Sequence, residues 1–218
     1  MHYPWRSISS GNKPAILPRG DRYKFTLGSG MISFADLSMM NELYSCKAIC
    51  KNITDAIVCE NGGFPHPRNC SKCLCPGGYG GDNCSERPDN GCGKVLKAER
   101  WWQEENVVFK NYKRKYIDGY QKCTYWIKNY SVKLEFSAGV FQAPKGFIVE
   151  VKFHPKYFER QEDGCVSAGV EIKTNEDQTL TGYSEAGCFN DRQIYQSTIY
   201  EEKFGPVAAY LEKDKDPI

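Results

Sequence analysis

The most regular hydrophobic pattern in this sequence is a strict alternation in its C-terminal half. In residues 147–153 (FIVEVKF) every odd position is apolar, and the two charged side chains fall on the opposite face. Residues 132–136 repeat this alternation, and residues 169–173 follow it as well. A period of two predicts strands with one buried face. Because Gly, Pro and Asn turns separate these strands and no helical period is convincing, we predict a β-sandwich over residues 92–205.

The N-terminal region has a helical period instead. Three apolar residues lie three and four positions apart, on one face of a short helix: Leu37, Met40 and Tyr44. Either Ser33 or Asp36 is placed to cap the N-terminus of this helix. The helix is too short to bury that face alone, and the only cysteine within residues 1–46 is the last residue. We therefore expect this segment to be mobile and sensitive to proteases.

Residues 47–85 have no hydrophobic period and are rich in cysteine and turn residues. Six cysteines lie among Gly and Pro residues: Cys50, Cys59, Cys70, Cys73, Cys75 and Cys84. A unit of this size cannot close a hydrophobic core by itself, so three disulfides are expected to hold it together. A zinc site built from Cys70, Cys73 and Cys75 is the competing interpretation, but a structural zinc site needs two separated ligand pairs.

Composition narrows the class of protein. Lys and Arg number 29 against 27 Asp and Glu, and the net charge of +2 predicts neither a nucleic-acid partner nor a membrane-surface partner. No apolar run approaches the roughly 18 residues of a membrane span, and the 13% aromatic content excludes a disordered chain. Eleven cysteines indicate disulfides and a secreted, extracellular protein. Because the count is odd, one cysteine has no partner within this sequence.

The first residues bear on how the chain reaches that compartment. Residues 1–7 (MHYPWRS) have no apolar stretch, so a signal peptide is absent from this chain. A secreted composition without an export signal leads us to expect a sequence that lacks its front end.

Two motifs in the first segment resemble the end of an astacin-type catalytic domain, from the secreted zinc metalloendopeptidases of the metzincin group. Met1-His2-Tyr3 is similar to the end of the Met-turn of this family, Ser-Ile/Val-Met-His-Tyr. Residues 32–37 (ISFADL), followed by Asn41, Tyr44 and Cys46, are similar to the closing helix of the domain. The tripeptide alone carries little weight, but the closing helix lies at the right distance from it.

The next two segments resemble modules that follow the catalytic domain in nematode members of this family. The run 73–79 (CLCPGGY) and Cys84 are similar to the C-terminal half of an EGF-like module. Residues 92–93 (CG) and 123–127 (CTYWI) are similar to the first two cysteine motifs of a CUB domain. The resemblance thus covers nearly the whole chain.

The resemblance implies a multi-module fold. Residues 1–46 are the truncated C-terminal piece of an α+β metzincin catalytic domain. Residues 47–85 are a small disulfide-rich EGF-like module, and residues 92–205 are an all-β CUB sandwich. Residues 86–91 form a linker between these modules, and residues 206–218 form a tail, of which residues 211–218 are expected to be loose.

The resemblance also implies a disulfide pairing, which the spacing alone does not choose. The implied pairs are Cys50–Cys70, Cys59–Cys73, Cys75–Cys84, Cys92–Cys123 and Cys165–Cys188. In the family, the cysteine that closes the catalytic domain pairs with one near the start of that domain. Cys46 occupies the closing position and is therefore expected to be unpaired here.

Four asparagines stand in acceptor sequons for N-glycans. Asn52-Ile53-Thr54 and Asn129-Tyr130-Ser131 are the candidate glycosylation sites in a secreted context. Asn69-Cys70-Ser71 and Asn83-Cys84-Ser85 match formally. In these two, a disulfide at the central cysteine is expected to crowd the site.

The chemistry implied by the resemblance is peptide-bond hydrolysis at a zinc ion held by three histidines, with a glutamate as general base. That site needs His-Glu-x-x-His on a helix. The three histidines of this chain are His2, His66 and His154, and none is followed by Glu. Two accessory residues remain: Met1, the apolar floor of the Met-turn, and Tyr3, which in the parent enzyme donates a hydrogen bond to the transition-state oxyanion. We expect zinc in the intact parent enzyme, no zinc in this chain, and no peptidase activity from this chain alone.

Calcium binding is not expected either. Many CUB domains place an Asp between the third cysteine and a Val/Ile-Glu-Ile strand, and Ala168 stands at that position here. Asp163 is the nearest substitute, but it lies on the other side of Cys165. Residues 47–49, before the EGF-like module, also lack the acidic residues of calcium-binding relatives.

The sequence therefore predicts part of a secreted zinc metalloendopeptidase that hydrolyses peptide bonds in extracellular proteins. Its CUB and EGF-like modules are expected to bind protein substrates or extracellular matrix proteins. The alternative is a non-catalytic secreted adhesion or targeting protein built from the same two modules, although residues 1–46 tell against it. An intracellular zinc-binding protein is a third interpretation, which requires reduced cysteines.

Overall fold

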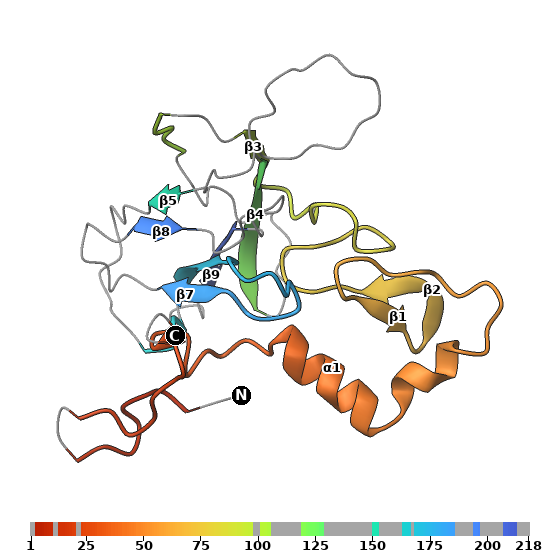
Figure 1. Cartoon of the computed structure of the whole chain (residues 1–218), viewed down its shortest axis with the longest axis horizontal. Coiled ribbons are helices and arrows are strands. Elements are labelled where there is room, and N and C mark those ends of the chain that lie inside the picture. The colour runs from red at the N-terminus through yellow and green to blue at the C-terminus, as the bar shows by residue number, and fades with distance from the viewer. Residues whose placement is uncertain are drawn as a thin grey trace, which may run out of the picture.

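The computed structural model describes residues 3–10, 13–20, 23–97, 101–105, 119–128, 150–152, 163–166, 168–185, 194–196 and 207–212. These residues form a mixed α/β, disulfide-rich fold (Figure 1). The elements are α1 (Phe34–Leu43), the 3-10 helix η2 (Cys46–Cys50), and the strands β1 (Phe64–His66), β2 (Asn69–Leu74), β3 (Val95–Lys97), β4 (Tyr120–Lys128), β5 (Glu150–Lys152), β6 (Ala168–Ile172), β7 (Tyr183–Glu185), β8 (Ile194–Gln196) and β9 (Val207–Glu212). In this part of the chain, no helix is long and apolar enough to cross a membrane.

Three regions follow one another along the chain. We call residues 3–46 the N-terminal segment, residues 47–85 the cysteine-rich segment and residues 92–212 the sheet region. In Figure 1, α1 and the β1–β2 hairpin lie together on one side of the strands of the sheet region. η2 joins them, because it contacts both α1 and β1.

The sheet region is built on five strands in the order β3-β4-β9-β6-β7. β4, β9, β6 and β7 pair antiparallel, whereas β3 runs parallel to β4. β5 and β8 form a separate antiparallel pair. Successive residues of β4 are buried, among them Cys123, Thr124 and Tyr125, and Ile172 in β6 is completely buried. Since neighbouring side chains of a strand point to opposite faces, β4 is covered on both faces.

The strand predictions can be compared with these elements one by one. The alternation at 169–173 corresponds to β6, and β5 lies within the alternation at 147–153. The strand predicted at 132–136 lies outside the described residues. The prediction of a tail at residues 206–218, loose from residue 211, is wrong in part, because Val207–Glu212 form β9, which pairs with both β4 and β6. The run VAAYLE is short and not strictly alternating, so pairing on both sides decides its conformation.

The cysteine-rich segment is held by an antiparallel β1–β2 hairpin and three disulfides. The structure has the pairs Cys50–Cys70, Cys59–Cys73 and Cys75–Cys84, and Cys92–Cys123 joins the start of the sheet region to β4. These four pairs are the same as those that the resemblance implies. Each cysteine of the competing zinc interpretation lies in a disulfide, so that site does not form.

The linker between these regions is fixed by Arg87. Its Nη1 donates to the backbone carbonyls of Pro88 at 3.0 Å, Cys92 at 3.1 Å and Thr124 at 3.2 Å. Just before it, Gly80 and Glu86 exchange two backbone hydrogen bonds. One guanidinium group thus ties residues 86–91 to β4.

The predicted helix forms as α1, and Ser33 is its cap. The Ser33 Oγ accepts a hydrogen bond from the backbone N–H of Asp36 at 3.0 Å and donates to the Asp36 carboxylate at 2.8 Å. This hydrogen bond to the charged form lowers the pKa of Asp36. No residue of α1 is buried; Met40 is half exposed, and Leu43 is more than half exposed. The apolar face of α1 is therefore largely open among the described residues, although Phe34 packs on Phe64 at a ring distance of 5.7 Å.

Candidate functional site

Tyr3 lies one residue before the point where the N-terminal segment packs against itself. Its side chain is 69% exposed. The following residue, Pro4, packs on Gly28: a Cβ added at Gly28 would lie 2.6 Å from the Pro4 ring, and the φ of Gly28 is +93°. Met1 and His2 lie outside the described residues. The phenol of Tyr3 is thus presented to solvent at the edge of a packed turn.

Trp5 fixes this part of the chain to the sheet region. Its side chain is only 3% exposed, and its indole N–H donates to the carboxylate of Asp163 at 2.9 Å. Lys24 Nζ lies 3.8 Å and the Arg6 guanidinium 4.0 Å from the Trp5 ring centroid, and Phe25 packs edge-on. A buried indole needs a partner for its N–H, and cations are attracted to its ring face. Packing on Phe25 and the cation–π contacts with Arg6 and Lys24 hold Trp5 within the N-terminal segment, and its hydrogen bond joins this segment to Asp163.

The backbones of the N-terminal segment and the sheet region also approach each other closely near Trp5. The Gly164 N–H donates to the carbonyl of Phe25 at 3.2 Å. A Cβ added at Gly164 would lie 2.2 Å from the backbone carbon of Gly28, so no side chain fits there. Met31 packs on Tyr120, whose hydroxyl donates to the Val166 carbonyl at 2.8 Å. The expectation that residues 1–46 are mobile stays a prediction, but these contacts with distant residues of the sheet region tell against it for the part around Trp5.

The described residues do not fit a zinc ion. His66 accepts a hydrogen bond at Nδ1 from the backbone N–H of Arg68 at 3.1 Å, and His2 and His154 lie outside the described residues. Across the part of the chain that the structure describes, no three His, Cys, Asp or Glu side chains form a group that could hold a metal ion. For calcium, Ala168 is buried at the start of β6, and Asp163 is bonded to Trp5.

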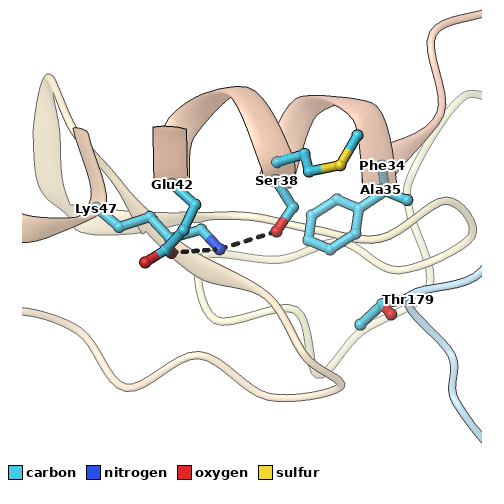
Figure 2. A pocket seen from close by; sticks show the side chains of 7 residues that line it. Phe34, Ala35, Ser38, Glu42, Lys47 and Thr179 are labelled. Atoms are coloured by element: carbon cyan, nitrogen blue, oxygen red, sulfur yellow. Dashed lines mark hydrogen bonds and ion pairs between the residues drawn. The ribbon is translucent and has the colours of Figure 1, made fainter. Parts of the chain in front are cut away.

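A pocket of about 350 Å³ opens beside α1 (Figure 2). It is lined by Phe34, Ala35, Ser38, Met39, Glu42, Lys47 and Thr179. Figure 2 shows Lys47 reaching back to the helix, where its Nζ lies 3.2 Å from the Glu42 carboxylate and donates to Ser38 Oγ at 2.9 Å. The charged groups therefore satisfy one another, and the remaining wall is largely apolar. The pocket offers contact area but no paired acid and base for catalysis.

A second contact between regions, besides that of Trp5 with Asp163, connects the cysteine-rich segment to the sheet region. We call these two contacts the joints. The Trp126 indole N–H donates to the Gly78 carbonyl at 2.9 Å, and its ring packs on Tyr79 at a distance of 5.7 Å. The Tyr79 hydroxyl donates to the Gln178 side chain at 3.0 Å, and burial raises the pKa of Tyr79 to about 12. Lys173 is buried beside it, donates to the Gln178 carbonyl at 2.7 Å, and has its pKa lowered by burial.

The other predicted site residues are dispersed over the molecule. Cys46 forms no disulfide with another described residue and is half-buried. Cys165 is buried in the sheet region, and its predicted partner Cys188 lies outside the described residues, so that pair stays a prediction. Asn52 is exposed, whereas Asn129 lies outside the described residues.

Sequence reasoning missed both joints. Trp5 and Asp163 are 158 positions apart, and no local pattern links them. In the sequence, the run 76–79 indicates an EGF-like module, but it does not indicate that Gly78 and Tyr79 contact Trp126. The only available signals were single tryptophans beside polar residues, and a buried Trp needs a hydrogen-bond acceptor that the sequence does not identify.

The chain is similar to zinc metalloproteinases of Caenorhabditis elegans. It is 38% identical to the zinc metalloproteinase nas-31 over 198 residues, which cover 91% of this chain and 30% of that relative. It is 36% identical to nas-32 over 83% of this chain and 25% of the relative, and 31% identical to nas-25 over 91% of this chain and 47% of the relative. The chain thus spans less than half the length of these curated relatives. No protein-family profile and no solved structure matches it.

Proposed function

We propose that this chain is the C-terminal part of a secreted zinc metalloendopeptidase of the astacin family, which hydrolyses peptide bonds in extracellular proteins. The observation that carries the proposal is the similarity to the zinc metalloproteinase nas-31 over 91% of the chain. The residues of this chain that lie outside the match are fewer than the residues of any one of the three regions. Each region therefore contributes to the match. A likeness confined to one disulfide-bonded module would support an adhesion protein equally well.

In this proposal each region has its own role. Residues 1–46 are the end of the peptidase domain, residues 47–85 are an EGF-like module, and residues 92–205, with β9, are a CUB domain. The disulfides Cys50–Cys70, Cys59–Cys73 and Cys75–Cys84 support the EGF-like assignment. The antiparallel order β4-β9-β6-β7 supports an all-β module after it.

The hydrolytic site itself lies elsewhere in the parent enzyme. The 218 residues contain no His-Glu-x-x-His, and the described residues do not fit a zinc ion. Among the described residues, the group proposed to act in catalysis is the exposed hydroxyl of Tyr3, which in the intact enzyme donates a hydrogen bond to the oxyanion of the transition state. Because Trp5 holds the neighbouring turn on Asp163, the sheet region has a defined orientation relative to Tyr3. Protein substrates or matrix proteins bound by the CUB and EGF-like modules are thereby presented to the peptidase domain.

Comparing the 218-residue chain with the native secreted protein tests this proposal. The purified chain should cleave no protein substrate, with or without added zinc. The native protein, captured from the culture medium of its source cells by an antibody against the sheet region, should show peptidase activity that a chelator removes. Chelator-sensitive cleavage by the chain alone would contradict the proposed division. A captured protein of the size of this chain and without activity would favour the non-catalytic adhesion protein.

A further inference from the structure

The cysteine-rich segment contains two formal glycan sequons with the same sequence, Asn-Cys-Ser, in different surroundings. They begin at Asn69 and Asn83, and the central residues are Cys70 and Cys84. The sequence predicts that the disulfide at each central cysteine crowds its sequon. In the structure the two sites differ in exposure and in the hydrogen bonds of the acceptor asparagine, and this difference bears on which of them can be glycosylated.

At Asn69 the disulfide does not obstruct the acceptor. Asn69, Cys70 and Ser71 are the first three residues of β2, with Asn69 and Ser71 exposed and Cys70 half-buried between them. The pairing of β1 with β2 is irregular here, because Asn69 lies opposite His66 and Cys73 opposite Pro65. The hydrogen bond between Ser71 Oγ and Asn69 Oδ1 nevertheless brings these two exposed side chains together, while the Cys70 side chain is bonded to Cys50. The site directly follows the turn of the β1–β2 hairpin, where a large substituent projects into solvent.

The hydrogen bonds of Asn69 involve only its oxygen. The backbone N–H of Ser71 donates to Asn69 Oδ1 at 3.2 Å, and Ser71 Oγ donates to the same oxygen at 2.7 Å. Among the described residues, the amide nitrogen Nδ2 donates to no protein group. The hydroxyl of the sequon is thus already beside the amide of the acceptor, and the nitrogen that receives the sugar has no partner to give up within the described part of the chain.

At Asn83 the amide nitrogen is engaged. Ser85 makes the same two contacts with Asn83 Oδ1, at 3.3 Å from N–H and 2.6 Å from Oγ. Here, however, Nδ2 donates to the carboxylate of Glu60 at 3.3 Å, and the Asn83 carbonyl accepts from the Glu60 N–H at 2.8 Å. Asn83 and Ser85 are half-buried, and Cys84 between them is completely buried. A sugar on Asn83 would displace Glu60 from the surface of the folded segment.

We propose that Asn69 is an N-glycosylation site of this protein and that the identical sequon at Asn83 is left unmodified. The proposal rests on the proposed function in one respect, since it requires that the chain enter the secretory route. In the reaction, Asn69 Nδ2 forms a bond to the anomeric carbon of a lipid-linked oligosaccharide, and the bond from that carbon to the lipid diphosphate breaks. The diphosphate leaves with the bonding electrons, and one Nδ2 proton passes to a base of the oligosaccharyltransferase.

The experiment expresses the 218-residue chain in animal cells behind a cleavable leader, with a C-terminal tag that holds one established acceptor sequon. Glycosidase treatment of the secreted protein in heavy-oxygen water converts each glycan-bearing Asn to a labelled Asp, and mass spectrometry then gives the occupancy of each site. Asn69→Gln and Ser71→Ala each remove the proposed sequon, and Asn83→Gln is the matched control. Peptide mapping without reduction checks that Cys50–Cys70 is intact in every variant.

The expected result is label at residue 69 in most molecules and none at residue 83. Asn69→Gln and Ser71→Ala should each remove the mass of one glycan, whereas Asn83→Gln should leave the mass of the glycans unchanged. An unlabelled Asn69 in molecules whose tag is labelled would overturn the proposal, and so would equal labelling of Asn69 and Asn83. Because the leader delivers the chain to the lumen, this result does not depend on the proposed protease function, which the activity of the native protein tests separately.

Discussion

The N-terminal segment and the cysteine-rich segment are of similar length but are held by constraints of opposite kinds. In the cysteine-rich segment, three disulfides join residues that are 9 to 20 positions apart. In the N-terminal segment, the decisive contact joins Trp5 to Asp163, 158 positions away. The first kind of constraint is local and covalent, and the second depends on the fold of the sheet region. The cysteine-rich segment should therefore keep its structure when the N-terminal segment loses its own.

The largest effect is expected from removing a disulfide of the cysteine-rich segment. Cys84 is completely buried, and Cys75→Ser combined with Cys84→Ser should lower the free energy of unfolding of this segment by about 2–5 kcal/mol. Hydrogen exchange should show lost protection in residues 59–84. The Gly164 amide, which bonds to Phe25, should keep its protection. An equal loss of protection at Gly164 would show that the two segments are not independent.

Trp5→Ala is expected to have the next largest effect and to act on the other segment. Removing a buried aromatic side chain costs about 3–5 kcal/mol, here drawn from the packing of the N-terminal segment on the sheet region. Limited proteolysis should cut within residues 3–30 much faster, while the disulfide-bonded residues 50–84 stay intact. Trp101→Ala is the matched control, because Trp101 is 67% exposed and should leave the cleavage rate unchanged. Unchanged cleavage in Trp5→Ala would refute the role given to this contact.

The Asp163 carboxylate allows a finer test of the same contact. Asp163→Leu leaves the indole N–H of a buried Trp5 without an acceptor, at a cost of about 1–3 kcal/mol. Asp163→Asn keeps an acceptor oxygen and should cost clearly less. Cleavage rates within residues 3–30 should therefore rank Asp163→Leu above Asp163→Asn, and both above the unchanged chain. Equal rates for the two variants would mean that the hydrogen bond contributes nothing.

The smallest effect concerns the joint at Tyr79. Tyr79→Phe removes the hydrogen bond to Gln178 and should cost about 0.5–1.5 kcal/mol below pH 10. Because burial raises the pKa of Tyr79 from 10.0 to about 12, the folded state keeps this proton where the unfolded state loses it. The contribution of Tyr79 to stability should therefore fall as pH rises from 10 to 12. Denaturant unfolding of both proteins over this range checks it, and a constant difference between them would contradict the burial of this hydroxyl.

The sequence predicted the local features of the molecule well. Cysteine spacing and turn residues indicated a disulfide-held unit at residues 47–85, since such a unit cannot close a core otherwise. Ser33 was one of two predicted caps, and the structure confirms it because an N-cap depends only on residues within one turn. The alternation at 169–173 predicted β6, in which the apolar residues Val170 and Ile172 are buried.

The features that the sequence did not predict depend on distant partners. β9 has no strict alternation and is a strand because β4 and β6 pair with it on both sides. The hydrogen bond of Trp5 needs Asp163, and the backbone of Gly28 packs on Gly164, so both contacts depend on residues more than 130 positions away. The sequence predicts that a disulfide at the central cysteine crowds the Asn69 sequon, as it does the identical sequon at Asn83. Only the folded segment shows that Asn69 and Ser71 are exposed, whereas Asn83 and Ser85 are half-buried.

The central claim is that these residues belong to a zinc metalloendopeptidase whose hydrolytic site lies outside them. Mass-spectrometric sequencing of the native secreted polypeptide, captured through its sheet region, tests this claim most directly. The account predicts that the same polypeptide yields a peptide containing His-Glu-x-x-His and retains one zinc ion per chain. It also predicts a disulfide between Cys46 and a cysteine that is not among these 218 residues. A native polypeptide without His-Glu-x-x-His and with a free thiol at Cys46 would contradict the account.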